Sequence, residues 1–194
     1  MSKADETRQK IIEQAAVLFN QKGYFGTSMS DVMRATGLGK GGIYNHFQSK
    51  DELAIEAFNF AYHCVLDRIN AAIAKADSAT DKLKALVSVF FEYSDNPPIE
   101  GGCPLLNTAV DSDDAHPGLH DRAQHAVNSC RRMVRTMVEE GIANQEISST
   151  VEPDCVATIL ISTIEGAVMM TRLYGDGIHL KRAVAHLQEY IDRL

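Results

Sequence analysis

The sequence predicts an all-α fold, and three observations lead to that prediction. Apolar residues recur at helical spacing along most of the chain: Ile12, Ala15, Ala16 and Phe19, for example, follow the i, i+3, i+4, i+7 pattern of one helix face. No segment alternates apolar and polar residues long enough to indicate a strand. The interruptions between periodic segments contain glycine, proline and small polar residues. We therefore expect three short N-terminal helices and a bundle of about six longer ones, about nine in all.

The charge of the chain is distributed unevenly. Its 194 residues carry a net charge of -7, which argues against a protein that coats nucleic acid without selectivity. Residues 1–50, however, hold seven Lys and Arg against four Asp and Glu, a balance of +3, whereas the remainder has a balance of -10. This asymmetry predicts an anion-binding head, residues 1–50, on an acidic body, residues 51–194.

The composition predicts a soluble, cytoplasmic protein. Hydrophobic residues make up 45% of the chain, enough for a core at this length. No uninterrupted apolar run approaches the roughly 18 residues of a membrane span. The polar start of the chain contains no hydrophobic signal segment. The cysteines, Cys64, Cys103, Cys130 and Cys155, are scattered, which indicates reduced thiols and not a disulfide framework.

Caps and helix breakers place the first three helices. The first helix is expected to end at Gly23. Ser28 and Asp31 have the spacing of a capping box, which opens a second helix that Gly37 stops. A third short helix is expected over residues 39–46.

Longer helices follow these three. Ser49 is the expected N-cap of a fourth helix that runs to about Lys75 without Gly or Pro, which is longer than most helices of globular proteins. The remaining helices are expected over residues 80–93, 105–110, 117–143, 153–174 and 177–193.

The segment GLGKGGIYNHF, residues 37–47, contains glycines at G-x-G-x-x-G spacing. A dinucleotide-binding turn with this spacing must follow a β-strand, but here a capped helix precedes it. A P-loop is excluded as well, because Gly41 stands where that loop needs Ser or Thr after the lysine. A helix, a glycine turn and a second short helix form instead the order of a helix-turn-helix.

The residues of this segment suit contact with DNA. The second helix of a helix-turn-helix enters the major groove, where its first residues meet bases and phosphates. Lys40 and Lys50 supply cations, and Tyr44 and His46 supply hydrogen-bonding groups. The alternative is that the glycines only shape a turn and that Tyr44 and His46 are ordinary, partly buried residues.

The segment FGTSMSDVMRATGLGKGGIYNHFQSKDEL, residues 25–53, resembles the DNA-binding signature of the TetR family of bacterial transcriptional regulators. The resemblance lies in TSM, DV, GLGKG, I-Y-x-H-F and S-K-x-x-L, which follow in order without a gap. It implies a homodimer whose two heads bind adjacent major grooves of a palindromic operator. The residues that it implies at the DNA are Thr27, Ser28, Lys40, Gly41, Tyr44, Asn45, His46 and Lys50.

The same resemblance implies roles for the body. It implies a ligand-responsive repressor that a small lipophilic effector releases from DNA, with the last two long helices forming the dimer interface. The expected interface residues are Ile159, Ser162, Gly166, Ala167 and Met170. The expected pocket residues are Phe58, Tyr62, Phe90, Phe91, Cys103, Asn107, Met133, Met137 and Met169. Packing inside the monomer remains the alternative for both sets.

Cys103 supports an alternative function. It follows two glycines and precedes Pro104 at an expected helix start. A thiolate at such a position is stabilised by unpaired N–H groups. The chain could then be a thiol-based sensor of oxidants or electrophiles that acts through Cys103, although a small buried residue in a helix-entry turn explains the position too.

A cluster of acids and histidines follows the expected sixth helix. It includes Asp113, Asp114, His116 and His120, and the two histidines have a spacing that metal ligands use on a helix. Pro117 is expected to begin the next helix, which leaves His116 outside it. We therefore expect a solvated loop, with no metal and no cofactor.

Two further classes of protein are opposed by the sequence. No Ser-His-Asp order and no paired carboxylates of known spacing indicate an enzyme, and the overall acidity opposes a nonspecific architectural DNA-binding protein.

Arg131, Arg132 and Arg135 are expected on a solvated helix face, where Glu139 can pair with Arg135. An anionic effector bound by one of these arginines is the alternative.

Overall fold

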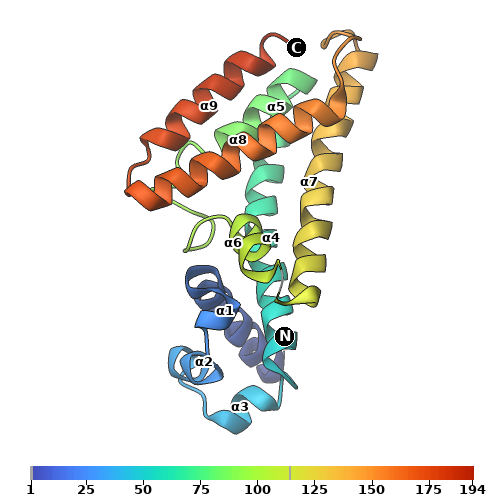
Figure 1. Cartoon of the computed structure of the whole chain (residues 1–194). Coiled ribbons are helices and arrows are strands. Elements are labelled where there is room, and N and C mark those ends of the chain that lie inside the picture. The colour runs from blue at the N-terminus through green and yellow to red at the C-terminus, as the bar shows by residue number, and fades with distance from the viewer. Residues whose placement is uncertain (1, 114) are drawn as a thin grey trace. The chain divides into compact units, whose positions relative to one another are not determined.

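The computed structural model describes residues 2–113 and 115–194, and within them the chain forms nine α-helices and no strand (Figure 1). The all-α prediction is therefore confirmed. The helices are α1 (Lys3–Gly26), α2 (Met29–Thr36), α3 (Lys40–Tyr44), α4 (Lys50–Ile73), α5 (Ala79–Ser88), α6 (Pro104–Ser112), α7 (Pro117–Ala143), α8 (Pro153–Tyr174) and α9 (Ile178–Ile191).

The chain divides into two compact units. The first unit comprises the residues up to Cys64 and Ile99–Ala126, and the second comprises Val65–Pro98 and Val127–Leu194. The first unit thus holds α1, α2, α3, α6 and the beginnings of α4 and α7. It is larger than the head predicted as residues 1–50, because α6 packs against α1.

The core of the first unit is built from one apolar face of each of its first helices. From α1 it takes Ile11 and Ala15, and from α2 it takes Val32, all fully buried. Ile43 of α3 and Phe47, four residues later, are 0% and 1% exposed. Because α3 has only five residues, these two buried side chains hold it in place.

α1 differs from its predicted end. Gly23 has φ 74° and ψ 170°, which interrupts the helical geometry, but the helix resumes and ends at Gly26. Glycine adopts this positive φ without the strain that a β-carbon would introduce. At Gly23, where the sequence predicts a stop, the helix therefore kinks and then continues.

α5 is shorter than predicted. The helix ends at Ser88, and the turns after it are closed by hydrogen bonds to the carbonyl three residues earlier, such as Phe91 N to Ser88 O at 3.1 Å. Phe90 and Tyr93 are buried within these turns, with ring centroids 5.2 Å apart. The predicted helix over residues 80–93 therefore ends early, because the backbone after Ser88 is wound more tightly than an α-helix.

In the second unit α9 packs against both α8 and α5. Leu160 and Val168 of α8 and Leu180 and Leu187 of α9 are almost completely buried. α8 is long and apolar enough to qualify as a membrane span by length and composition alone, with a mean hydropathy of 1.4 in an 18-residue window that is 39% buried. A helix that lies in the core of a protein passes the same test.

Candidate nucleic-acid interface

α2 is held at both ends by its own sequence. The Ser28 hydroxyl accepts a hydrogen bond from Asp31 N at 3.2 Å, and Asp31 Oδ2 accepts from Ser28 N at 2.9 Å and from the Ser28 hydroxyl at 2.6 Å. These bonds to Ser28 hold the pKa of the Asp31 carboxyl below its ordinary value. Gly37 ends the helix in the left-handed conformation and returns its N–H to Met33 O at 2.9 Å. The predicted capping box and the predicted glycine stop are both confirmed.

α3 turns one face inward and the other outward. Ile43 lies in the core, whereas Lys40, Gly41, Tyr44 and Asn45 are exposed. A β-carbon added to Gly41 would meet no atom within 4 Å, so the backbone here is open to approach from outside.

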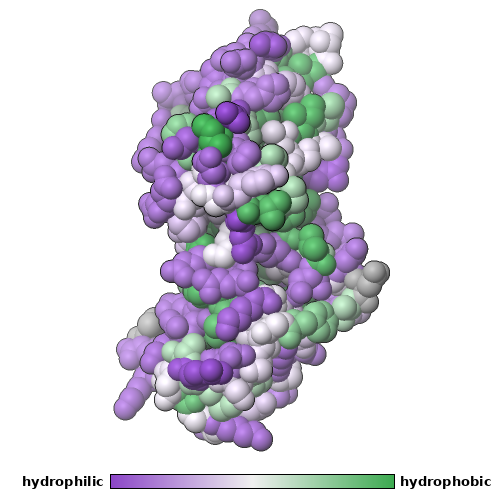
Figure 2. All heavy atoms as spheres, turned by 60° about the vertical axis from the view of Figure 1, so that its left-hand side comes forward, coloured by the Kyte–Doolittle hydropathy of each residue, from purple (hydrophilic) through white to green (hydrophobic). Residues whose placement is uncertain are grey.

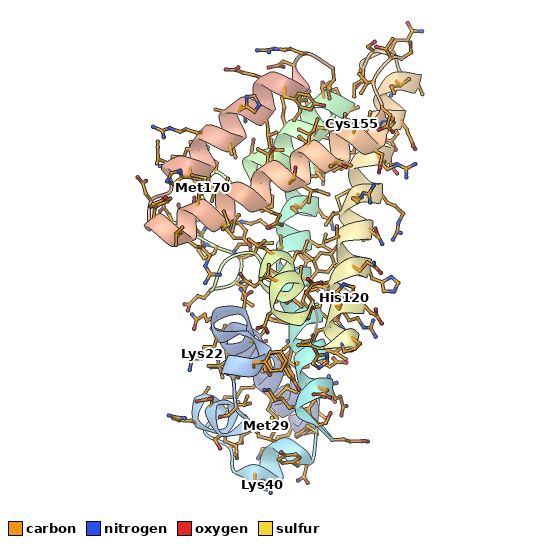
Figure 3. The ribbon with its side chains drawn as sticks, in the orientation of Figure 1. Lys22, Met29, Lys40, His120, Cys155 and Met170 are labelled. Carbon is orange, nitrogen blue, oxygen red and sulfur yellow. The ribbon has the colours of Figure 1, made fainter. Side chains whose placement is uncertain are left out.

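Lys40 and Tyr44 lie next to each other on this outward face. Lys40 is the first residue of α3 and lies at the edge of the first unit (Figure 3). Its Nζ is 5.7 Å from the centroid of the Tyr44 ring, which is 42% exposed. His46 is half-buried, beside the exposed Asn45. The face therefore combines a cation, hydrogen-bonding groups and an accessible backbone, which are the groups that contact DNA in a major groove.

Thr27 does not reach this outward face, and its prediction is corrected. The residue is 1% exposed, and its hydroxyl donates to the carbonyl oxygen of Gly23 at 2.8 Å. The hydroxyl therefore closes the end of α1 and does not point toward a phosphate. Ser28 is exposed, with its hydroxyl engaged in the capping box of α2.

Lys50 belongs to a cluster around Tyr24. Its Nζ lies 4.0 Å from the centroid of the Tyr24 ring, and burial lowers the pKa of Lys50. The Tyr24 hydroxyl donates to Asp51, and burial followed by this contact raises the pKa of Tyr24 to about 12. His116 Nε2 is 3.6 Å from Asp51 Oδ1, and its ring is 4.5 Å from that of Tyr24. No local pattern in the sequence predicts this cluster, because its members come from α1, the start of α4 and the residue before α7.

Comparison with known proteins identifies the family. Residues 11–57 match the family model described as bacterial regulatory proteins, tetR family, and residues 79–187 match a tetracyclin repressor-like C-terminal domain. The chain belongs to the TetR family of bacterial transcriptional regulators. The helix-turn-helix assignment is therefore confirmed, and the dinucleotide interpretation of the glycine spacing stays excluded.

Solved structures of this family resemble the whole chain. A TetR transcriptional regulator from Chloroflexus aurantiacus J-10-FL is 45% identical with a TM-score of 0.95, covering 98% of this chain and 96% of that one. A TetR-family regulator from Cytophaga hutchinsonii is 33% identical with a TM-score of 0.90 at the same coverages. Among curated relatives, the HTH-type transcriptional repressor DhaR of Mycobacterium sp. (strain GP1) is 22% identical over 86% of this chain and 82% of its own length.

In this TetR-family chain, one side of α8 carries exposed small and apolar residues. Ser162 is exposed, Met170 is 38% exposed, and a β-carbon on Gly166 would meet no atom within 4 Å. Toward the end of the helix, Leu173 is 73% and Tyr174 is 66% exposed. Figure 2 shows apolar residues in patches between polar ones on one face of the molecule, and Figure 3 marks Met170 on α8.

Three residues of the predicted interface and pocket differ in exposure from what those roles require. Ala167 is 6% exposed and packs inside the second unit, so it is not available to a partner. Ile159 is half-buried. Met169, predicted to line the effector pocket, is 53% exposed on α8 and extends the outer apolar side instead.

The other predicted pocket residues are distributed over both units. Phe58, Tyr62, Cys103 and Asn107 belong to the first unit, and Phe90, Phe91, Met133 and Met137 belong to the second. Phe58 and Asn107 line a cavity of about 30 Å³ in the first unit. Phe91 lines a groove of about 360 Å³ in the second, together with Arg68, Ser88, Val89, Glu92 and Gln188. The pocket assignment stays a prediction.

The environment of Cys103 does not favour a thiol sensor. Cys103 is the residue before α6 and is 2% exposed. Oxidants react with accessible thiolates, and a side chain as buried as that of Cys103 is not accessible to them. The position fits the alternative of a small buried residue in a helix-entry turn.

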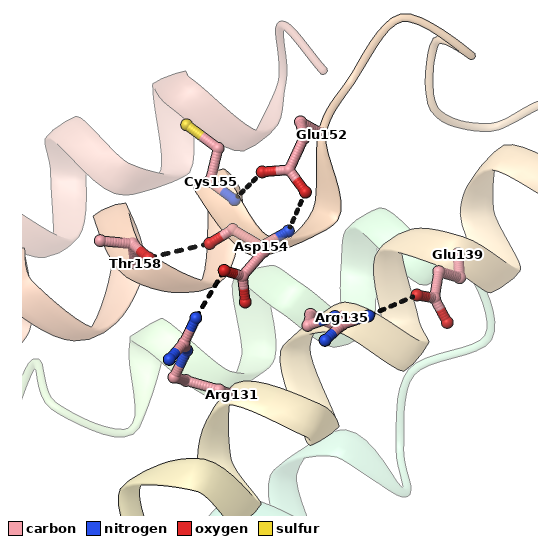
Figure 4. A network of polar contacts seen from close by, with 7 residues as sticks. All are labelled: Arg131, Arg135, Glu139, Glu152, Asp154, Cys155 and Thr158. Atoms are coloured by element: carbon pink, nitrogen blue, oxygen red, sulfur yellow. Dashed lines mark hydrogen bonds and ion pairs between the residues drawn. The ribbon is translucent and has the colours of Figure 1, made fainter.

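Two arginines of α7, Arg131 and Arg135, form ion pairs (Figure 4). Arg131 Nη2 lies 2.5 Å from Asp154 Oδ2, and Arg135 Nη2 lies 3.5 Å from Glu139 Oε1. Glu152 accepts hydrogen bonds from Asp154 N at 3.0 Å and from Cys155 N at 2.5 Å, which caps the start of α8. The i, i+4 pairing predicted for Arg135 is confirmed.

The histidines near the start of α7 serve its backbone and nearby acids. His116 Nδ1 accepts a hydrogen bond from Leu119 N at 3.1 Å, and His120 Nε2 is 4.0 Å from Asp113 Oδ1. Among the described residues, no group of three His, Cys, Asp or Glu side chains is placed to hold a metal ion. Asp114, which the sequence analysis included in this cluster, lies outside the described residues.

Proposed function

We propose that this TetR-family regulator is a cytoplasmic repressor that binds a palindromic operator as a homodimer and is released by a small lipophilic effector. The observation that carries the proposal is the outward face of α3, where Lys40, Gly41, Tyr44 and Asn45 are exposed together while Ile43 anchors the helix in the core. The +3 balance of residues 1–50 directs this end of the chain toward a polyanion.

The dimer is supported by the exposed side of α8. Large apolar residues such as Met170 and Leu173 are costly to leave in water, and contiguous exposed apolar patches mark interaction sites. Gly166 and Ser162 are small enough to let a second helix approach closely. In a symmetric dimer the same side of α8 meets itself, and two α3 helices then read half-sites about one helical turn, ~34 Å, apart or a multiple of it.

The repressor assignment is supported by the similarity to DhaR, the relative described above as a transcriptional repressor. The effector class is supported by the aromatic and methionine side chains predicted for the pocket, since apolar ligands bind to such residues. A repressor of this kind is released when its effector binds the free conformation more tightly than the DNA-bound one.

Two steps test the proposal. The purified chain is used to select bound fragments from the genome of its source, and the best fragment then reports its release by a library of small molecules. We expect one palindrome to be enriched and apolar compounds to release it. Enrichment of no palindrome would overturn operator binding, and release by polar anions alone would overturn the effector class.

A further inference from the structure

A polar contact joins the kinked end of α1 to α6 inside the first unit. At the kink the N–H of Tyr24 donates to Oδ2 of Asp111 at 2.6 Å. A β-carbon on Gly23 would lie only 2.8 Å from Oδ1 of the same carboxylate. Asp111 therefore approaches the backbone of α1 at a position that glycine alone allows, both for space and for its positive φ.

A second group of hydrogen bonds, one turn earlier on α6, also fixes the position of α6 along α1. The Asn107 amide donates to Asn20 O at 3.0 Å, to Asn20 Oδ1 at 2.8 Å and to Gly101 O at 2.8 Å. Asn20 is 7% exposed, and its own amide donates to the carbonyls of Glu100 at 2.8 Å and Gly102 at 2.9 Å. Hydrogen bonds are directional, and several of them act together at this buried position. They therefore hold α6 at one position along α1.

The kink leads directly into the helix-turn-helix. Only residues 24–27 separate it from Ser28, the N-cap of α2. Within them Thr27 is buried and returns its hydroxyl to Gly23 O at 2.8 Å. The cavity that residues of α1, α4, α6 and α7 line here is about 30 Å³, room for no more than about one or two water molecules. Beside it, α1 and α6 pack directly against each other.

We propose that Asp111 is a positioning residue for operator binding. Its carboxylate fixes the bend of α1 that sets the direction of α2 and α3. The proposal rests on the operator binding proposed above. Removal of the carboxylate leaves the Tyr24 N–H without its partner, so the chain adopts other bends in which this N–H is hydrated.

Operator binding by two variants of Asp111 tests the proposal. Dissociation constants are measured at one salt concentration for the fragment that the wild-type chain selects and for an unrelated duplex. We expect Asp111→Ala to weaken operator binding about 3- to 30-fold and to leave the unrelated duplex unaffected. Asp111→Asn should fall between Ala and wild type, because its side-chain carbonyl still accepts a hydrogen bond. The control Asp113→Ala removes an exposed carboxylate near the end of the same helix and should bind as the wild type does.

Hydrogen exchange at the Tyr24 amide provides a second readout. In the full chain we expect this amide to exchange faster in Asp111→Ala than in wild type, and at an intermediate rate in Asp111→Asn. Unchanged operator affinity in Asp111→Ala would overturn the positioning role, as would an equal loss for both duplexes or failure of both variants to fold. Selection of no operator by the wild-type chain would overturn the proposed function and this role with it.

Discussion

Tyr24 is the residue around which the charges of the first unit are arranged. Lys50 lies over its ring, Asp51 accepts from its hydroxyl, and His116 packs against its edge. Burial is the largest cause of its raised pKa, and the Asp51 carboxylate adds to it. In return the hydrogen bond from Tyr24 is the largest cause that holds the pKa of Asp51 below 3.8. The hydrogen bond between the two side chains therefore stabilises the folded chain only when Tyr24 is protonated and Asp51 is ionised.

This pair predicts the pH dependence of stability. We expect the contribution of Tyr24 to be complete below its unfolded pKa of about 10 and to be lost as the pH rises toward its folded value of about 12. The contribution of Asp51 should be present above pH 3.8 and be lost as the pH falls through the lowered pKa. Urea unfolding midpoints measured across pH should decrease at both the alkaline and the acid end. In Asp51→Asn the decrease at the acid end should be smaller.

Spectrophotometric titration measures the same pair directly. Subtracting the curve of Tyr24→Phe from that of the wild type isolates one tyrosine. In Asp51→Asn the pKa of Tyr24 should fall from about 12 but stay above its ordinary value of 10.0, because burial remains. A pKa of Tyr24 that does not change in this variant would contradict the contact.

Lys40 predicts the salt dependence of operator binding. Lys40→Gln should reduce the slope of log K against log salt by about 0.9 for each head, because one phosphate contact and its released counterion are lost. The loss in affinity should be similar for all sequences. Lys75→Gln, a change of the same charge at an exposed position of the second unit, should leave the slope unaltered. A slope that Lys40→Gln does not reduce would remove Lys40 from the interface.

At the scale of elements, α1 and α2 show two different uses of a left-handed glycine. Gly37 ends α2 with φ 72° and faces open space, whereas Gly23 kinks α1 with φ 74° against the Asp111 carboxylate. The sequence predicts a helix stop at both positions because the local signal is the same. The difference between them comes from α6, which supplies a partner for the N–H after Gly23 and allows the helix to resume.

Alanine should destabilise the chain by different amounts at these two glycines. Gly37→Ala should lower the free energy of unfolding by about 1–2 kcal/mol, the cost of a left-handed residue. Gly23→Ala should add about 1–3 kcal/mol to that loss, because ψ 170° places this residue in a backbone region that almost only glycine adopts and because its β-carbon would overlap Asp111. Urea unfolding at neutral pH measures both variants. Equal losses at the two positions would contradict both the greater strain at Gly23 and its close approach to the carboxylate.

At the scale of the whole molecule, the exposed side of α8 predicts the association state. Leu173→Asp places a charge on each copy of the proposed interface, and like charges that face each other cost several kcal/mol. We therefore expect the dimer dissociation constant to rise at least about 100-fold and operator binding to weaken with it. Light scattering after size-exclusion chromatography measures the association state.

Val110→Asp is the matched control for this change. Val110 lies on α6 in the first unit and is 74% exposed, compared with 73% for Leu173. Because it is not on α8, its aspartate should leave the dimer intact. A monomeric Val110→Asp variant, or a dimeric Leu173→Asp variant, would move the interface away from α8.

By itself the sequence determined the all-α architecture, the capping box of α2, the glycine turn and the membership of the TetR family. These follow from local patterns: apolar periodicity, caps and a signature of about thirty adjacent residues depend on neighbours in the chain. It also predicted the outward face of α3, since Ile43 and Phe47 are spaced to share the inner side.

Only the tertiary structure decided which polar side chains are used inside the molecule. It buried Thr27, turned Lys50 to Tyr24, placed Met169 on the outer side of α8 and brought Asp111 to the kink of α1. Tyr24 and Asp111 are 87 positions apart, and no pattern of nearby residues marks such a pair. Their contact exists because the apolar faces of α1 and α6 pack together, and packing chooses partners by shape and burial that a linear sequence does not display.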